Sequence, residues 1–505
     1  MSHRSPAPHP LTGKTSITVA VMLLLLAVPY ASPGLTRFRI ARAPWDGAPL
    51  AEVTNAALAP TSTAQLTHGE TTLKASRNEA TVTNALPDAP VAKALDPQVL
   101  AKTKGSIAVE DETEHALDKF YASLAKTRGA RGASGEGPRA AGAGSGADPA
   151  AVTRILHYGD SVITSDYVSG TMRRKLQAEL GDAGHGFILI ANPWEWYFHN
   201  DVAHGAAEGW GSSRVTGPTN KDGMYGVGGV TFTGSPGASA FFGTAERGNF
   251  GKKVSRFDIY YLDTPGGGDV EAKIGSTIER FSTKGDEKTS HIKSFSVPDG
   301  EARLSLRVVS GNPRLFGVAL ERDVPGVVYD ALGANGARAE LLGSINPTHW
   351  ADQMALRKPA LVVLQYGTNE SEAPALAGNY EKTLGVVVAM IKAAAPDASI
   401  LIASPLDRAE TSEGGGMRTK PIIKKLVAAQ RNVAKENGVA FWNTFEAMGG
   451  EGSMAKWMRN GLGGGDLTHP TPAGAELIGD LFCKSLTTGF EAWLSRHPEA
   501  SKPAE

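Results

Sequence analysis

The sequence predicts an α/β fold, in which helices cover both faces of a parallel sheet, interrupted by an inserted all-β module. Two observations lead to this prediction. From residue 152 onward, short apolar runs alternate with helix-like segments through short connections, which is the pattern of a parallel sheet. Between residues 200 and 320, short runs of alternating hydrophobicity are separated by Gly, Pro, Asp and Asn, which is typical of antiparallel strands.

The α/β part starts with the strand "RILHYGD" (154–160). In the helix after it, apolar residues recur every four positions from Val168 to Leu180, and Gly181 stands where a helix ends. The apolar run at 359–367 is typical of a strand buried on both faces. The elements expected after it are a helix at 380–396, a strand at 399–405, a helix at 420–438, a strand at 439–443 and a helix from about 471. In the inserted module we expect strands at 256–263, 268–275, 290–298 and 302–311.

The first 150 residues predict export rather than a folded domain. The apolar stretch "ITVAVMLLLLAVPY" has the length of a signal-peptide core and falls short of the ~20 residues of a full span. Residues 1–36 are therefore expected to be a signal peptide or an uncleaved membrane anchor, which places the protein in the periplasm or cell envelope. Residues 37–150 are rich in Ala, Thr, Pro and Gly and predict a low-complexity, mostly disordered tether, with one helix near 112–126.

Composition excludes several classes of function. The 51 basic and 52 acidic residues nearly cancel, so no net field favours nucleic acid as a partner. A single cysteine, Cys483, rules out an internal disulfide framework and a cysteine-based metal site. No nucleotide fingerprint is present, and we expect no metal, no organic cofactor and a monomer. Four histidines lack metal-ligand spacing with acidic residues and are expected to be structural: His157, His185, His199 and His204.

Ser161, in "ILHYGDSVITSDYVSG", stands where the first strand ends. In a parallel sheet, sites form outside the carboxyl ends of the strands. A serine hydroxyl becomes nucleophilic when a base takes its proton, and the base needs a partner that fixes its tautomer. "GGGDLTHPTPAG" offers both, because Asp466 and His469 stand three residues apart just before a helix. Serine is also a favoured helix N-cap, but capping alone explains neither of these residues.

An ester attacked by serine passes through an oxyanion, which needs hydrogen-bond donors aimed at it. The candidates are the backbone N–H of Ser161, the side-chain amide of Asn369 in "YGTNE", and a backbone N–H in "ALGANGARAE". A glycine matters in the last segment because a bare backbone approaches a ligand closely. Of Gly333 and Gly336, we choose Gly336.

With these residues in view, the chain resembles the SGNH (GDSL-type) hydrolases. "HYGDS", "GANGA", "YGTNES" and "DLTH" fall in the order and at the strand ends of the four blocks of that family. The resemblance implies a three-layer αβα, flavodoxin-like hydrolase domain over 151–199 and 321–495, with the all-β domain inserted at 200–320. It also implies a catalytic triad of Ser161, Asp466 and His469. The backbone N–H groups of Ser161 and Gly336 and the side-chain amide of Asn369 would then form the oxyanion hole.

More narrowly, the β-rich insert between the serine and glycine blocks is similar to that of the Ape-type peptidoglycan O-acetylesterases, in which it is a carbohydrate-binding-like β-sandwich. Glu370 stands where many relatives carry aspartate, but "GTNE" is usual in the Ape-like group. Val162 stands where Ape-like sequences often have histidine. In "NPWEWYFHN", Trp194 and Trp196 are candidates for stacking on sugar rings, although packing of the insert against the sheet is the favoured role.

These residues predict an exported serine esterase that removes O-acetyl groups from a cell-envelope polysaccharide, with O-acetylated peptidoglycan first. One alternative is a polysaccharide O-acetyltransferase, which uses the same triad but passes the acetyl group to a sugar hydroxyl. Another is a non-catalytic glycan-binding protein whose working part is the β-insert. The intact set of five site residues argues against the second alternative.

Overall fold

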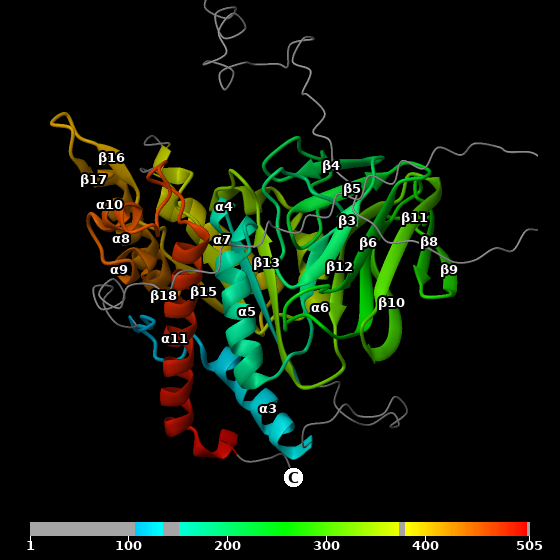
Figure 1. Cartoon of the computed structure of the whole chain (residues 1–505), viewed down its shortest axis with the longest axis horizontal. Helices are drawn as coiled ribbons and strands as arrows, with labels where there is room; N and C mark the ends of the chain where they lie inside the picture. The colour runs from blue at the N-terminus through cyan, green and yellow to red at the C-terminus, as the bar shows by residue number, and fades with distance from the viewer. Residues whose placement is uncertain (1–106, 135–150, 373–378, 502–505) are drawn as a thin grey trace, which may run out of the picture. The chain divides into compact units, whose positions relative to one another are not determined.

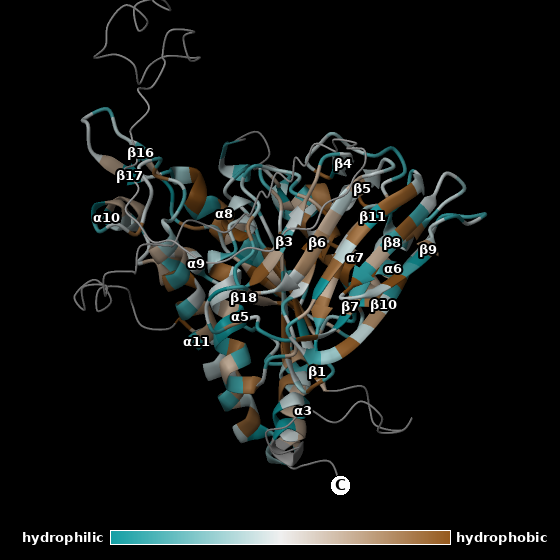
Figure 2. Ribbon diagram, turned by 45° about the vertical axis from the view of Figure 1, so that its right-hand side comes forward, coloured by the Kyte–Doolittle hydropathy of each residue, from teal (hydrophilic) through white to brown (hydrophobic). Residues whose placement is uncertain are grey.

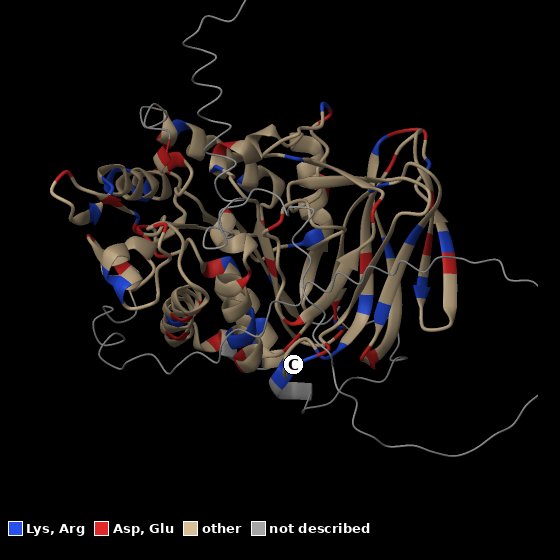
Figure 3. Ribbon diagram, turned by 45° about the horizontal axis from the view of Figure 1, so that its top comes forward, with Lys and Arg blue, Asp and Glu red and all other residues tan. Residues whose placement is uncertain are grey.

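The computed structural model describes residues 107–134, 151–372 and 379–501 (Figure 1). The predicted signal or anchor segment at 1–36 and most of the predicted tether lie outside these residues. No helix among the described residues has the length and apolar character needed to cross a membrane. Lys and Arg are interspersed with Asp and Glu over the strands and helices that Figure 3 shows.

A five-stranded parallel sheet forms the centre of the α/β part. Numbered along the chain, its strands stand in the order 2-1-3-4-5, which is the flavodoxin-like order. The predicted three-layer flavodoxin-like fold is confirmed. From one edge to the other, the strands are β13 (Gly326–Gly333), β1 (Val152–Gly159), β14 (Leu361–Gln365), β15 (Ser399–Ala403) and β18 (Ala440–Trp442).

Helices cover both faces of this sheet because its strands alternate their buried side chains between the two faces. On β1, Ile155 belongs to one buried cluster and Leu156 to the other. The first face packs against α3 (Asp118–Ser134), α5 (Tyr167–Leu180) and α11 (Pro472–Arg496), seen together in Figure 1. The second packs against α6 (Pro347–Arg357), α7 (Tyr380–Ala394) and α8 (Pro421–Glu436).

Shorter elements complete the α/β part. They are α4 (Ser161–Thr164), η2 (Ala339–Ser344), η3 (Glu370–Glu372), β16 (Ala409–Thr411), β17 (Met417–Thr419), α9 (Thr444–Ala447), α10 (Ser453–Arg459) and η5 (Pro498–Ser501). Several of them follow the carboxyl ends of the parallel strands, where the predicted site residues also lie.

The inserted region forms two antiparallel sheets. One has the order β10-β7-β12-β5-β4 and the other β3-β6-β11-β8-β9. The strands are β3 (Val202–Ala206), β4 (Trp210–Arg214), β5 (Val230–Gly234), β6 (Ser239–Thr244), β7 (Val254–Asp263), β8 (Gly268–Ile274), β9 (Thr277–Ser282), β10 (Thr289–Gly300), β11 (Arg303–Gly311) and β12 (Arg314–Glu321). Along β8 and the first part of β11, buried apolar residues alternate with more exposed polar ones, as the sequence predicted, and Figure 2 shows strands of the insert with mixed colours.

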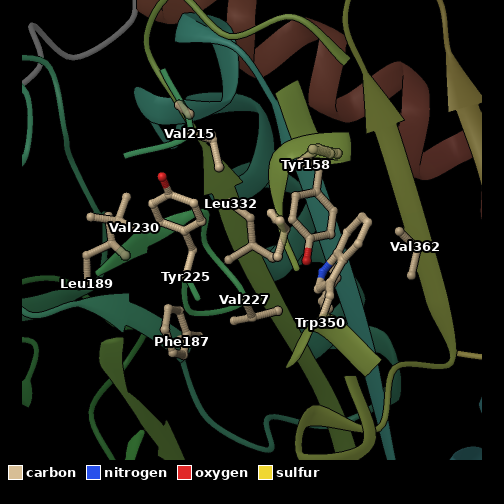
Figure 4. Packing of buried hydrophobic residues seen from close by; sticks show 14 of the residues in the cluster. Tyr158, Phe187, Leu189, Val215, Tyr225, Val227, Val230, Leu332, Trp350 and Val362 are labelled. Carbon is tan, nitrogen blue, oxygen red and sulfur yellow. The ribbon is translucent and has the colours of Figure 1, made fainter. Parts of the chain in front are cut away.

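The insert and the parallel sheet share one buried apolar cluster. In Figure 4, Leu332 of the parallel sheet lies between Tyr225 of the insert and Tyr158 of β1. The strand β2 (Gly186–Leu189) comes before the predicted boundary at residue 200, yet it pairs with β12 of the insert. The predicted boundary therefore misses this strand, because four consecutive apolar residues show no alternation that marks them as part of an antiparallel sheet.

Buried charges also join the two parts. Glu321, at the end of β12, accepts hydrogen bonds from Arg154 of β1 and Arg357 of α6. Arg357 in turn binds Asp330 of β13 through two nitrogen atoms, at 2.5 and 2.7 Å. A buried carboxylate or guanidinium without its partner is strongly destabilising, so this network fixes where the insert meets the sheet.

Residues 107–134, which we assigned to the tether, belong instead to the folded part. Phe120 and Leu124 are four residues apart on one side of α3 and are buried in the same cluster as α5 and α11, as is Leu117 just before the helix. Glu110 exchanges two backbone hydrogen bonds with Phe441 of β18. The helix that we expected near 112–126 is present as α3, but the tether prediction is wrong for this stretch because the helical spacing was given too little weight.

The four histidines expected to be structural are all buried. His185 Nε2 lies 3.0 Å from His199 Nδ1, and His199 Nε2 lies 2.8 Å from the Tyr197 hydroxyl. Burial lowers the pKa of His199 to about 3 and that of His204 to about 4. These imidazoles are therefore neutral in the folded protein at any pH above about 5.

This burial predicts acid sensitivity of the fold. Below pH 6.5 the unfolded chain protonates these imidazoles and the folded chain does not, so stability falls as pH falls. The loss is about 1.4 kcal/mol per histidine at pH 5.5. Replacing His204 with Phe is expected to reduce the slope of unfolding free energy against pH, measured with urea between pH 5 and 7. His115→Gln, at an exposed site, is the control, and an unchanged slope in His204→Phe would contradict the prediction.

Candidate active site

Ser161 begins the one-turn helix α4 directly after β1. Asp160 caps this helix, its carboxylate accepting from the Val162 N–H at 3.0 Å. Gly159 permits the tight strand-to-helix turn, because a Cβ there would lie 2.4 Å from Ile163 Cγ1. Ser161 is thereby held at the carboxyl end of the sheet, directly after the buried strand β1.

Asp466 and His469 lie in the loop before α11 and meet Ser161 there. His469 Nε2 is 2.9 Å from Ser161 Oγ, and His469 Nδ1 is 2.6 Å from Asp466 Oδ2. The other carboxylate oxygen of Asp466 accepts from the backbone N–H groups of Thr468 and His469, both at 3.0 Å. Leu467 turns the loop with a left-handed φ of 59°. The structure thus brings together three residues that the sequence separates by up to 308 positions.

The charge and exposure of this trio suit proton transfer. Burial alone would raise the pKa of the Asp466 carboxyl, but hydrogen bonds from the His469 ring and from two backbone N–H groups hold it below its ordinary value. Asp466 is therefore an anion that orients the imidazole. The side chain of His469 is 46% exposed and that of Asp466 52%, so water reaches the site directly.

The three predicted oxyanion donors lie on neighbouring loops at the same edge of the sheet. Asn369 Nδ2 donates one hydrogen bond to the Ala337 carbonyl at 2.8 Å, which fixes the amide and leaves its second N–H uncommitted. Gly336 has a left-handed φ of 75° and is exposed. Within the described part of the chain, the backbone N–H groups of Ser161 and Gly336 donate no hydrogen bond.

Gly333, the glycine that we did not choose, has a packing role. A Cβ at this last residue of β13 would lie 2.2 Å from the Thr164 nitrogen of α4. The backbone contact leaves no room for a substrate atom. The same close approach fixes α4, and with it Ser161, against the end of β13.

Glu370 is a further site residue, which the sequence marked only as a departure from relatives. Its Oε1 accepts from the Ala339 N–H at 2.9 Å. Asn369 and Glu370 thus each bind the segment that follows Gly336. Burial raises the pKa of the Glu370 carboxyl to about 7. In the sequence, the only sign that Glu370 binds this segment was its position beside Asn369, after a buried strand.

The two candidate sugar-stacking tryptophans differ in their surroundings. Trp194 is partly buried against the shared apolar cluster and lies under the Arg214 guanidinium, so it packs as we favoured. Trp196 is 68% exposed, which is not what the favoured packing role predicts. Its backbone carbonyl accepts from the Asn335 side chain at 3.1 Å, beside Gly336. Trp196 therefore stands next to the candidate oxyanion loop.

Val162, which replaces the histidine frequent in Ape-like sequences, is buried in the apolar cluster on the α3–α5–α11 face. Its side chain is packed rather than open to a substrate.

Among the described residues, no cluster of three or more His, Cys, Asp or Glu is arranged to hold a metal ion.

Residues 299–477 match the model of the GDSL-like Lipase/Acylhydrolase family. The chain contains a GDSL-type hydrolase domain. The matched range includes Gly336, Asn369, Asp466 and His469, and it starts after Ser161, because the insert separates the serine from the other blocks. The placement of Ser161 in this GDSL-type domain therefore depends on its contact with His469 rather than on the family match.

Among solved structures, one match shares the fold and two others match more weakly. A peptidoglycan O-acetylesterase is 22% identical, with a TM-score of 0.61, and the match covers 76% of this chain and 99% of that one. The YxiM protein of Bacillus subtilis is 14% identical, with a TM-score of 0.29, covering 56% and 90%. A family two carbohydrate esterase from Cellvibrio japonicus is 12% identical, with a TM-score of 0.24, covering 57% and 98%. No curated protein sequence matches the chain. The first match covers 76% of this chain, so the fold that the two proteins share extends beyond residues 299–477.

Proposed function

We propose that this GDSL-type hydrolase is an exported serine esterase that removes O-acetyl groups from a cell-envelope polysaccharide, most directly O-acetylated peptidoglycan. The observation that carries the proposal is the hydrogen-bonded series Ser161–His469–Asp466 at the carboxyl end of a parallel sheet. Such a series activates a serine hydroxyl for attack on an ester carbonyl.

In the proposed reaction, His469 takes the proton of the Ser161 hydroxyl as its oxygen attacks the acetyl carbonyl. The negative charge on the carbonyl oxygen is stabilised by the N–H groups of Ser161 and Gly336 and by the amide of Asn369. His469 then protonates the departing sugar hydroxyl. Water, deprotonated by His469, releases acetate from the acetyl-serine in the second half of the reaction.

Two observations support a glycan and water as the reactants. Trp196 presents an exposed ring beside the Gly336 loop, and aromatic rings in this position suit the apolar face of a sugar. The half-exposed His469 leaves the acetyl-serine accessible to water, as hydrolysis requires. The similar fold of a peptidoglycan O-acetylesterase agrees with this substrate class.

Acetate release from O-acetylated peptidoglycan by the full chain tests the proposal. We expect release above the spontaneous rate, with base-treated, de-acetylated peptidoglycan as the blank. Adding a soluble chito-oligosaccharide acceptor separates the two chemistries, because a transferase would move acetyl groups to the acceptor and release less acetate. Absence of both release and transfer on O-acetylated peptidoglycan would overturn the proposed function.

Replacing Trp196 with Ala tests the glycan contact. We expect KM for O-acetylated glycan to rise about 10-fold, a loss comparable with other aromatic stacking contacts, while hydrolysis of 4-nitrophenyl acetate stays unchanged. Phe at this position is expected to restore most of the affinity because it keeps a ring. An equal loss on both substrates would show that Trp196 acts on the chemistry and not on sugar binding.

A further inference from the structure

Arg408 lies between two loops of the active site, in the segment that joins β15 to β16. Its side chain is only 8% exposed. The guanidinium donates to the Thr368 carbonyl at 2.9 Å and to the Ser371 hydroxyl in the loop after β14. In the opposite direction it donates to the Thr468 hydroxyl at 2.9 and 3.3 Å, in the loop before α11.

The partners of Arg408 occupy equivalent positions with respect to the site. Thr368 directly precedes Asn369, and Thr468 directly precedes His469. The residue before the oxyanion donor Asn369 and the residue before the base His469 are therefore both hydrogen-bonded to the same Arg408 guanidinium.

The charge of the buried guanidinium is balanced locally. Glu372 accepts from Arg408 at 2.6 Å and from Lys420 Nζ at 2.8 Å. Glu372 lies in η3, two residues after Glu370. A planar guanidinium with several donors holds two backbones at a set separation, which one ammonium group does not do. This geometry suits a residue that aligns two loops.

We propose that Arg408 is a positioning residue, which sets the distance between the oxyanion donor Asn369 and the base His469 through Thr368 and Thr468. The inference rests on the proposed function in one respect, which is that ester hydrolysis is the reaction that the positioning assists. Misplacement by about 1 Å of a group that acts in the transition state is enough to cost roughly 100-fold in rate.

The experiment compares Arg408→Met, Arg408→Lys and Thr468→Val with wild type, using 4-nitrophenyl acetate. Competent sites are first counted with a phosphonate that reacts with the serine, and kcat is expressed per competent site. We expect kcat to fall about 100-fold in both Arg408 variants and about 10-fold in Thr468→Val, with KM within about threefold of wild type. Lys keeps the charge but not the bridge, so it should not rescue.

Arg322→Met is the matched control. The Arg322 side chain is similarly buried. It donates to the Asp299 carboxylate through two nitrogen atoms and to the Asp182 carbonyl through a third, close to the residue at which β13 begins. Its loss should lower the melting temperature without lowering kcat per competent site. An equal fall of kcat in Arg322→Met and Arg408→Met, or a fall of less than threefold in both Arg408 variants, would overturn the proposal.

A second readout requires no turnover. The proton between His469 Nδ1 and Asp466 should give a resonance far downfield in the proton NMR spectrum. We expect this resonance to move or broaden in Arg408→Met and to stay in place in Arg322→Met. If wild type is inactive on every ester, the proposed function fails, but this measurement still decides whether Arg408 positions His469. An unmoved resonance in Arg408→Met would overturn the inference.

Discussion

Replacing Ser161 with Ala is expected to lower kcat on acetyl esters by roughly 10⁴- to 10⁶-fold, the loss typical of a serine that forms the covalent intermediate. Ser161 Oγ is the atom within 2.9 Å of His469 Nε2, so no neighbouring group replaces it as nucleophile. Acetate release, followed continuously with a coupled assay, measures the loss. Intact-protein mass spectrometry should show an acetyl adduct of about 42 Da on wild type and none on Ser161→Ala.

His469→Ala should lose as much as Ser161→Ala, and the double variant should lose no more than either, because the two residues act as a unit. Asp466→Asn should lose about 10⁴-fold, since the amide favours the wrong tautomer of the imidazole. His497→Ala, at the end of α11, is the control and should keep full activity. If Ser161→Ala retained a tenth of the wild-type rate, another nucleophile would have to be sought.

Much of this site was predictable because it lies at ends of strands that the sequence marks plainly. The apolar runs at β1 and β14 are strong signals, and each places a polar block at the carboxyl end of the sheet. Parallel pairing then brings Ser161 and Asn369 to one edge, whatever the residues between them do. The Asp-x-x-His spacing in the last loop predicted that Asp466 and His469 act together, and His469 Nδ1 lies 2.6 Å from Asp466 Oδ2.

Features that depend on contacts between distant segments could not be predicted. Arg408 carries no motif, and its role appears only when the loops at Thr368 and Thr468 are brought together. The pairing of β2 with the insert depends on β12, more than a hundred residues later. The packing of residues 107–134 onto the sheet was missed for a different reason. The sequences before and after this stretch have the composition of linkers, and the helical spacing of its apolar residues was therefore given too little weight.

Asn369→Ala is expected to reduce kcat by about 100- to 1,000-fold with little change in KM, because an oxyanion donor binds the transition state more strongly than the ester. One N–H of the amide is held by the Ala337 carbonyl, so the other is pre-oriented before the oxyanion forms. The rates should be measured per competent site, counted with a phosphonate, on 4-nitrophenyl acetate and on O-acetylated glycan.

Asn460→Ala is the matched control for Asn369→Ala, because its amide likewise donates to a backbone carbonyl, that of Lys456, at 2.8 Å. It should leave kcat unchanged. Asn369→Asp should be slower than Asn369→Ala, since a carboxylate would face the developing oxyanion with like charge. If KM instead rose by the same factor and kcat stayed unchanged, Asn369 would act in substrate binding. The oxyanion would then be stabilised by the backbone N–H groups of Ser161 and Gly336 alone.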